Sequence, residues 1–161
     1  QAHQSHFTHV NNMTFLRLTE ATTEAAGDIS RLLPQLSDRP HPFSLADLEA
    51  MLASDRCLVY CVRDEQSCRI VGMLTFAGYL IPTGEKWQLE DVVLDASLRG
   101  QGLARRFVSW AVEQLRRDHP AAPVYLTSRP SRVAANALYR SLGFQQRETN
   151  VYSIPALPPN L

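Results

Sequence analysis

The stretch that decides the fold is Leu98-Arg99-Gly100-Gln101-Gly102-Leu103-Ala104. A largely apolar, extended run precedes it at residues 89–94. A helical pattern follows it, with apolar side chains at Leu103, Phe107, Ala111 and Leu115. A glycine-bearing turn between a strand and a helix leaves backbone N–H groups unpaired at the positive end of the helix dipole. Because glycine has no Cβ to hold a phosphate away, the stretch predicts an anion cradle; glycine serving turn geometry alone is the alternative.

Composition and charge narrow the class of ligand. The chain has 161 residues, 45% apolar and 20% charged, which is typical of one ordinary globular domain. Its formal net charge is zero, which argues against a general nucleic-acid binder or a membrane-surface protein. Residues 96–140, however, hold eight arginines against two acidic residues and carry +6, so the remainder carries −6. A basic segment around an anion cradle suits a small ligand with several phosphates.

The cysteines predict a reducing compartment. There are three, Cys57, Cys61 and Cys68, and an odd count with two on one expected strand favours free thiols in a cytoplasmic protein. Since no second pair is present, core packing is favoured over a zinc site. No apolar run reaches the roughly 18–20 residues of a transmembrane helix.

The chain order predicts alternating strands and helices in a folded domain at residues 13–155. Residues 1–12 are expected to be a disordered leader or cloning remnant, and residues 156–161 a loose tail. Strands are expected at residues 15–18, 57–62, 70–80, 86–95, 124–127 and 145–154. Helices are expected at residues 23–36, after a Ser44 cap, after the cradle, and between a Ser131 cap and Gly143.

The strand before the cradle changes phase partway. Trp87 and Leu89 occupy one alternation, whereas Val92 and Leu94 occupy the other. A β-bulge near Asp91 would produce this change, and it would splay the neighbouring strands and free backbone groups for a ligand.

The chain has a glycine loop at residues 99–104, an asparagine and tyrosine followed by Gly-Phe within residues 136–144, and the acidic pair Glu90-Asp91. Together these three features resemble the GNAT superfamily of acetyl-CoA-dependent N-acetyltransferases. The cradle matches the family's pyrophosphate loop, Gln/Arg-x-x-Gly-x-Gly/Ala, as Arg99-x-x-Gly102-x-Ala104. The family's later motif, an asparagine, then a tyrosine three residues on, then Gly-Phe, is matched within residues 136–144. The third feature is the acidic pair Glu90-Asp91. The resemblance implies an α/β (α+β) domain with a mixed, mostly antiparallel sheet, splayed at the third or fourth strand, and helices on both faces.

The resemblance also implies where acetyl-CoA binds as co-substrate. Backbone groups at the helix start would hold the pyrophosphate, and the strand would pair with the pantetheine amides. The N–H of Val93 or Leu94 would also steady the thioester oxygen. Asn136 would bond either the pantetheine arm or the adjoining loop. The implied cofactor residues are Val92, Val93, Leu94, Arg99, Gly100, Gln101, Gly102, Leu103, Ala104, Arg105 and Asn136. Arg105 and Arg106 are the candidates for outer phosphates, with a solvated helix face as the alternative for both.

The resemblance assigns proton chemistry to two side chains. Tyr139 would protonate the departing thiolate, with a tyrosine packed on the sheet as the alternative. One carboxylate of the pair would accept the proton of the incoming ammonium, directly or through water, and Glu90 is our choice. Asp91 would lie beside the acceptor, with a solvated charge at the strand edge as the alternative, because strand alternation puts the two on opposite faces unless the bulge intervenes. Arg129 and Arg132 would bind a phosphate or carboxylate of the acceptor; Arg132 can equally reach a phosphate of CoA.

We therefore expect an N-acetyltransferase that acts directly on a primary amine of a small molecule: an amino sugar, an amino acid or a polyamine-like compound. Residues 88–93 also look like the corresponding strand of glucosamine-6-phosphate N-acetyltransferases. The alternatives are a protein-lysine or N-terminal acetyltransferase and a catalytically silent acyl-CoA sensor; a nucleotide-binding module ranks last. No metal and no covalent enzyme intermediate are expected. The resemblance makes a homodimer possible.

Overall fold

The computed structural model describes residues 8–157. Contacts divide the chain into two compact units, Gln1–Thr127 and Ser128–Leu161, each of which is described by itself. In the described residues the first unit contains a sheet in the order β1-β2-β3-β4-β5-β6. Its strands are β1 (Thr8–Val10), β2 (Met13–Leu18), β3 (Cys57–Asp64), β4 (Ile70–Ile81), β5 (Gly84–Leu94) and β6 (Val124–Tyr125).

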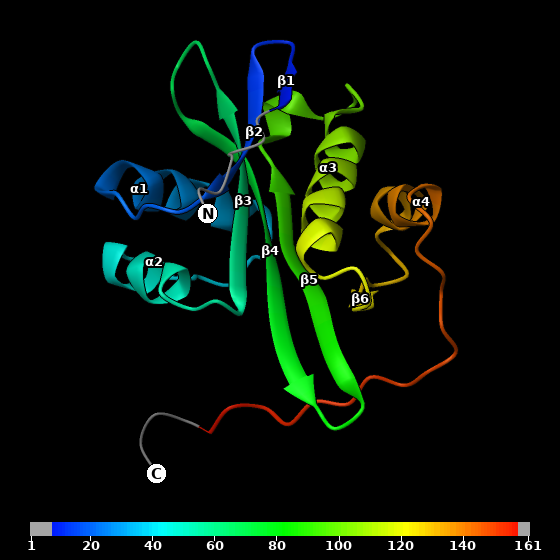
Figure 1. Ribbon diagram of the computed structural model, residues 1–161. Helices are drawn as coiled ribbons and strands as arrows, with labels where there is room; N and C mark the ends of the chain where they lie inside the picture. The colour runs from blue at the N-terminus through cyan, green and yellow to red at the C-terminus, as the bar shows by residue number, and fades with distance from the viewer. Residues whose placement is uncertain (1–7, 158–161) are drawn as a thin grey trace. The chain divides into compact units, whose positions relative to one another are not determined.

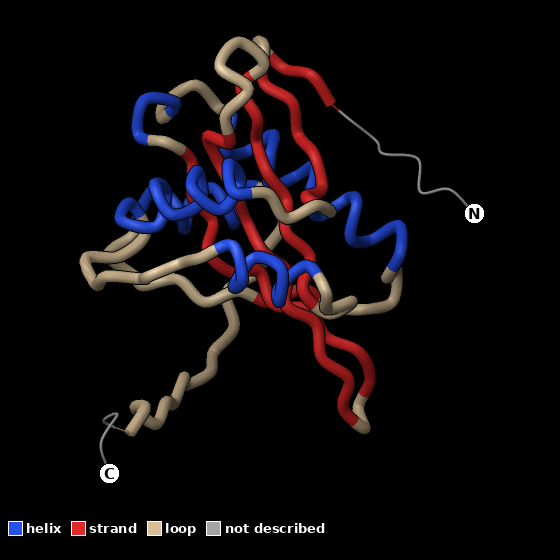
Figure 2. The backbone as a smooth tube through the Cα atoms, turned by 90° about the vertical axis from the view of Figure 1, so that its left-hand side faces the viewer, coloured by secondary structure: helices blue, strands red, loops and turns tan. Residues whose placement is uncertain are grey.

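The sheet is mixed and mostly antiparallel, as expected. Every neighbouring pair is antiparallel except β5–β6, which is parallel and short. Figure 2 shows the β4–β5 hairpin extending past the other strands. Leu80, near the tip of this hairpin, is 69% exposed.

Helices cover both faces of this sheet (Figure 1). The helical elements of the first unit are α1 (Thr23–Leu32), η1 (Leu33–Gln35), α2 (Leu45–Leu52), η2 (Ala96–Leu98) and α3 (Leu103–Asp118). Ser44 caps α2 with a reciprocal capping box, as the sequence predicts. The α1 and α2 side packs Ile29, Leu32 and Leu48 with inward residues of β3 and β4. The expected helix at residues 23–36 ends earlier, because Pro34 lies in the 3₁₀ turn η1.

On the opposite face of the sheet, aromatic side chains pack against α3. Phe15 of β2 lies 5.3 Å from the ring of Phe107 and 5.8 Å from the ring of Trp110 on α3. Tyr60 of β3 makes an edge contact with Trp110 at 5.5 Å. These contacts hold α3, and with it the cradle at its start, against the sheet.

The β1–β2 hairpin corrects the expectation that residues 1–12 form a disordered leader. Residues 8–10 pair with β2 rather than forming a disordered leader, and the turn has only two residues because Val10 is opposite Met13. Its central residues Asn11 and Asn12 have φ of 49° and 62°, as a type I′ turn requires. Residues 1–7 of the expected leader lie outside the described part.

The bulge in β5 is confirmed. The register between β4 and β5 shifts between Met73 and Thr75, which are opposite Val93 and Glu90 respectively. Asp91, inside the shift, has φ of 51°. The strand therefore changes phase where the sequence predicts it.

The second unit contains α4 (Val133–Ser141). Its start differs from expectation, because the N-cap is Arg132 rather than Ser131 and no side chain caps it. Gly143, with φ of 90°, ends the helix as expected, and the Phe144 N–H donates to the Tyr139 carbonyl at 3.1 Å. The strand expected at residues 145–154 is wrong: this segment has no regular secondary structure, and its backbone has no strand partner among the described residues. A strand-like sequence pattern does not by itself provide a neighbouring strand for backbone hydrogen bonds.

Candidate functional site

The cradle is built as the sequence predicts. After η2 the chain passes through Gly100 and Gly102, with φ of 78° and 72°, and enters α3. Gly102 is the N-cap and supplies no side chain, and the first helical bond runs from the Arg106 N–H to the Gly102 carbonyl at 3.3 Å. The N–H groups of the preceding helical turn therefore remain available for an anion. A Cβ on Gly102 would meet no atom within 4 Å, so backbone conformation, not space, requires glycine here.

Side chains of α1 and η1 hold the segment that leads into the cradle. Arg31 bonds the Asp95 carboxylate at 2.9 Å, and the Ala96 N–H donates to Gln35 Oε1 at 2.9 Å. Hydrogen bonds from Ser97 lower the pKa of Asp95; burial opposes them, and Arg31 and Gln35 lower the pKa further. Sequence reasoning missed these two contacts, which join residues more than sixty positions apart and have no local signature.

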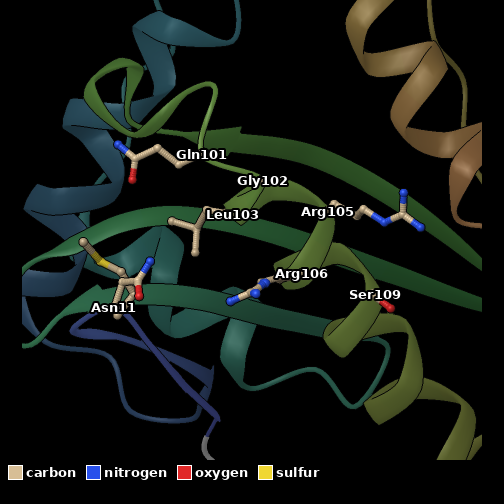
Figure 3. Close-up of a pocket in the computed structure, with 8 residues that line it drawn as sticks. Asn11, Gln101, Gly102, Leu103, Arg105, Arg106 and Ser109 are labelled. Carbon is tan, nitrogen blue, oxygen red and sulfur yellow. The ribbon is translucent and has the colours of Figure 1, made fainter.

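A pocket of about 470 Å³ adjoins the cradle (Figure 3). Arg106 extends toward Asn11, whereas Arg105 points away along the other side of α3. The lining residues are Asn11, Met13, Gln101, Gly102, Leu103, Arg105, Arg106 and Ser109. Sequence reasoning missed Asn11, Met13 and Ser109; the Asn11-Asn12 pair between Val10 and Met13 is a hairpin signal that identifies the turn but not its proximity to α3.

The outer edge of β5 is open beside the bulge. Among the described residues, β6 pairs only with Trp87 and Gln88. The Asp95 N–H donates to the Val71 carbonyl of β4 at 2.8 Å. Because antiparallel ladders alternate, the N–H of Val93 also points toward β4 and that of Leu94 points to the open edge. Of the two candidate donors for a thioester oxygen, geometry therefore favours Leu94.

Glu90 and Asp91 lie at the bulge and are both exposed. Although Glu90 is exposed overall, its partial burial raises the pKa of the carboxyl, and the neighbouring charge of Asp91 raises it further. A carboxylate with a raised pKa is a stronger proton acceptor once ionised, which suits a general base.

The loop before α4 carries the two arginines expected at the acceptor. Arg129 and Arg132 are exposed. Asn136 Nδ2 donates to the carbonyls of both residues, at 2.8 and 2.9 Å. The adjoining-loop alternative for Asn136 is thus present, and both its amide protons are engaged there. Only Oδ1 remains for a pantetheine amide.

Tyr139 lies on α4, half-buried beside the ring of Phe144 at 5.9 Å. Burial raises the pKa of its phenol, and the positive charge of Arg132 opposes that shift. The phenol is therefore protonated across the neutral range, as an acid must be. Tyr139, Asn136, Arg129 and Arg132 belong to the second unit, while the cradle, the β5 edge and Glu90 belong to the first. Their joint action stays a prediction.

The three cysteines differ in exposure. Cys61 is buried, and burial raises the pKa of its thiol to about 12, while Cys57 is partly buried with a raised pKa for the same reason. Cys68 is exposed. No group of three or more His, Cys, Asp or Glu side chains that could hold a metal lies within residues 8–157. Within the same range, no helix is long and apolar enough to cross a membrane.

A bulged strand followed by a glycine-capped helix, with an ionisable carboxylate at the bulge, is the arrangement that the sequence resemblance leads us to expect in an acetyltransferase. Residues 24–144 match the model of the acetyltransferase (GNAT) family. This chain belongs to that family.

Known relatives agree with this assignment. The chain is 30% identical over 117 residues to an L-2,4-diaminobutyric acid acetyltransferase of Wolinella succinogenes, with 71% of this chain and 62% of the relative covered. It thus spans less than two thirds of that relative's length.

Solved structures share the fold. An aminoglycoside acetyltransferase from an uncultured soil metagenomic sample, in complex with trehalose, superposes with a TM-score of 0.77 at 20% identity, covering 92% of this chain and 98% of that one. Glucosamine-6-phosphate N-acetyltransferase from Arabidopsis thaliana gives a TM-score of 0.72 at 18% identity, covering 88% and 97%. At these identities the likeness shows the fold alone.

Proposed function

We propose that this chain transfers the acetyl group of acetyl-CoA directly to a primary amine of a small-molecule acceptor. The observation that carries the proposal is the unbroken path from the bulge of β5 through η2 to the glycine-capped start of α3. This one segment presents an ionisable carboxylate, an open strand edge and unpaired helix N–H groups. Acetyl-CoA supplies an activated thioester, amides and a diphosphate, which these three features fit in turn.

The binding roles follow from the geometry. The N–H groups of residues 101–105 would hold the diphosphate, with Arg105 and Arg99 near its charge. Val92 and Leu94 would pair with the pantetheine amides, and the Leu94 N–H would stabilise negative charge on the thioester oxygen. Asn136 would support the arm through Oδ1.

The proton roles use two groups. Glu90 would take a proton from the acceptor ammonium, so that the nitrogen lone pair can attack the thioester carbon. The carbon–sulfur bond then breaks, and Tyr139 would give its phenolic proton to the departing sulfur. Asp91, Arg129 and Arg132 would bind the remaining charges of the acceptor.

The acceptor class is supported by the relatives. The curated relative is named for L-2,4-diaminobutyric acid, a small amine with a carboxylate. Glu90 and Asp91 suit its ammonium groups, and Arg129 or Arg132 suits its carboxylate. We therefore place a diamino acid ahead of an amino sugar or a polyamine.

CoA release from acetyl-CoA tests the proposal with L-2,4-diaminobutyrate, glucosamine 6-phosphate, an aminoglycoside and a lysine-containing peptide as acceptors. Turnover with a small amine, and a product heavier by one acetyl group, are expected. Initial-rate lines at several fixed acceptor concentrations should intersect, since no cysteine lies among the proposed site residues. Turnover of the peptide alone, or acetyl-CoA binding without any turnover, would contradict the proposal.

A further inference from the structure

A buried hydroxyl without a partner lies beside the proposed base. Thr75 of β4 is 7% exposed. Its Oγ1 has essentially no exposed area and no hydrogen-bond partner in the part of the chain that the structure describes. An unsatisfied buried hydroxyl is unfavourable, so its presence at this position needs an explanation.

The neighbours of Thr75 leave few partners. The strand register puts Val59 of β3 directly opposite it on one side and Glu90 of β5 directly opposite on the other. Residues directly opposite in an antiparallel pair share one face of the sheet. Along β4 the same face carries Met73 and Ala77. Among these neighbours, Glu90 alone has a strong hydrogen-bonding side chain.

Gln88 is the next polar side chain on this face, but it lies diagonally. It is opposite Ala77 rather than Thr75. Directly opposite residues have Cβ atoms about 4.5–5.5 Å apart, whereas diagonal neighbours are about 7–8 Å apart. The carboxylate is therefore the nearer partner.

The burial of the hydroxyl indicates that its partner comes from the protein. Because Thr75 Oγ1 is covered, neither bulk water nor an acceptor can touch it unless a neighbouring side chain moves. Glu90 is exposed and can rotate about its side-chain bonds. The Thr75–Glu90 pair is also the last regular one before the bulge, where strands commonly re-aim a side chain.

We infer that Thr75 is a positioning residue whose hydroxyl donates a hydrogen bond to the Glu90 carboxylate when that side chain turns in over β4. The inference rests on the proposed role of Glu90 as base. A hydrogen bond to the ionised form holds the carboxylate at one place on the strand. It also offsets the partial burial and the Asp91 charge, both of which raise the pKa of Glu90.

Other ionisable groups lie on the strands and the helix that neighbour this pair and must be kept constant. Asp91 is adjacent in β5, Lys86 lies further back on the same strand, and Tyr125 follows on β6. On the helix-covered side are the Cys57 thiol of β3 and, on α1, Asp28 and Arg31, which are engaged with Arg69 and Asp95 respectively. None of them is altered by a substitution at Thr75.

The direct test is an NMR titration of the Glu90 side-chain carboxyl in the full chain, with Glu90→Gln used to assign its resonance. Thr75→Val removes the hydroxyl at nearly constant shape and should raise the pKa of Glu90 by about one unit, since a bond to the charged form is lost. Thr75→Ser should keep the parent value. An unchanged pKa in Thr75→Val overturns the inference.

A matched control uses another buried threonine. Thr14 on β2 is 1% exposed and is opposite Arg63, not a carboxylate. Thr14→Val should leave the pKa of Glu90 unchanged. Should Thr75→Val fail to fold, Thr75→Ala makes the same test.

Kinetics give a second, separate measurement. The acidic limb of the kcat/KM profile should move to higher pH by about one unit in Thr75→Val and return in Thr75→Ser, with KM for acetyl-CoA unchanged. In a Glu90→Gln background, Thr75→Val should have no further effect. A parent without amine acetylation contradicts the proposed function, yet the NMR shift still decides the Thr75–Glu90 contact. If the parent is active but Thr75→Val leaves the acidic limb of the kcat/KM profile unmoved, the Thr75–Glu90 hydrogen bond is overturned and the proposed function is not.

Discussion

The segment from β5 to the start of α3 and the segment from residue 128 to Gly143 are held in different ways. The first is fixed by a strand ladder, by bonds from Arg31 and Gln35, and by six buried side chains of α3. The second has no buried side chain in α4, and its loop is held by two bonds from the Asn136 amide and by the Arg132 N–H, which donates to the Arg129 carbonyl at 3.0 Å.

The difference teaches where single substitutions act. A segment held by many backbone contacts tolerates the loss of one side chain. Its function is therefore most sensitive where the backbone has a positive φ that favours glycine, as at Gly102. A segment held by few bonds depends more on each of them, and the Asn136 amide supplies two of those in the second segment. Loss of a single side chain should therefore have more effect in the second segment, and the first should be most sensitive at its positive-φ glycine.

Tyr139→Phe is expected to have the largest effect. It keeps the ring against Phe144 but removes the proton for the departing sulfur. Since general acid catalysis contributes about 10²–10⁴-fold, kcat should fall by that factor while KM for acetyl-CoA stays nearly constant. The pKa of the Tyr139 phenol is raised, so the parent should remain active into the alkaline range and the variant should lose this limb of the profile.

Tyr79→Phe is the matched control for this substitution, because Tyr79 is 43% exposed on the β4–β5 hairpin. It should behave as the parent. A Tyr139→Phe enzyme within about threefold of the parent, well below the general-acid range, would make Tyr139 a packing residue.

Gly102→Val should come next and should act on binding. A branched side chain at φ of 72° is strained by about 2 kcal/mol, so the free loop should relax to another conformation, and returning it to the cradle on binding should cost about thirtyfold in affinity. The Cβ also holds a phosphate away from the main chain. Calorimetric titration with acetyl-CoA measures the loss. Gly27→Val, at an open site on α1 with ordinary φ, should bind normally. Normal binding by a folded Gly102→Val would remove the loop from the cofactor site.

Asn136→Ala tests the side-chain amide that makes two of the bonds in the second segment. Two neutral hydrogen bonds to the carbonyls of Arg129 and Arg132 are lost, each worth about 1 kcal/mol, so kcat/KM for the acceptor should fall by at most about thirtyfold. Asn150→Ala, in an exposed stretch, is the control. If both variants matched the parent, the loop would not depend on Asn136.

Arg31→Met should have the smallest effect. The Arg31–Asp95 pair is partly exposed, with side chains 40% and 20% accessible, so its loss should weaken acetyl-CoA binding by only about twofold to fivefold. Arg63→Met, which removes an exposed pair with Glu65, should bind as the parent.

The pH dependence of this small effect has a defined sign. The pKa of Asp95 is lowered by its hydrogen bonds, so its contribution is present above the ordinary carboxyl pKa and is lost as pH falls through the lowered value. Parent and Arg31→Met should therefore converge in acid. A difference in acetyl-CoA affinity between the two proteins that grew at acidic pH would contradict this role of the Arg31–Asp95 pair.

Local rules made the cradle and its strand predictable. The change of alternation at Asp91 indicates a bulge, and Gly102 before an apolar helical repeat indicates a glycine-capped start; both are properties of a few adjacent residues. The serine cap at Ser44 and the Gly143 helix end were predictable for the same reason.

What could not be predicted depends on partners distant in sequence. Nothing near Gln35 indicates that it receives the Ala96 N–H, because that contact forms only after the sheet has assembled. Residues 145–154 have a strand-like composition, yet a strand exists only when another strand offers it hydrogen bonds. The Arg132 cap shows the same limit at a helix start, where Ser131 was the better local candidate.

The exposure of Cys68 has a practical consequence for measuring turnover. Reagents that detect free CoA by its thiol also react with accessible protein thiols, and of the three cysteines Cys68 alone is exposed. Each enzyme molecule should thus add one early equivalent of signal that is independent of acceptor, which resembles a burst of product. Cys68→Ser should abolish this background, and the same thiol, in a turn of the β3–β4 connection, offers a single attachment point for a fluorophore.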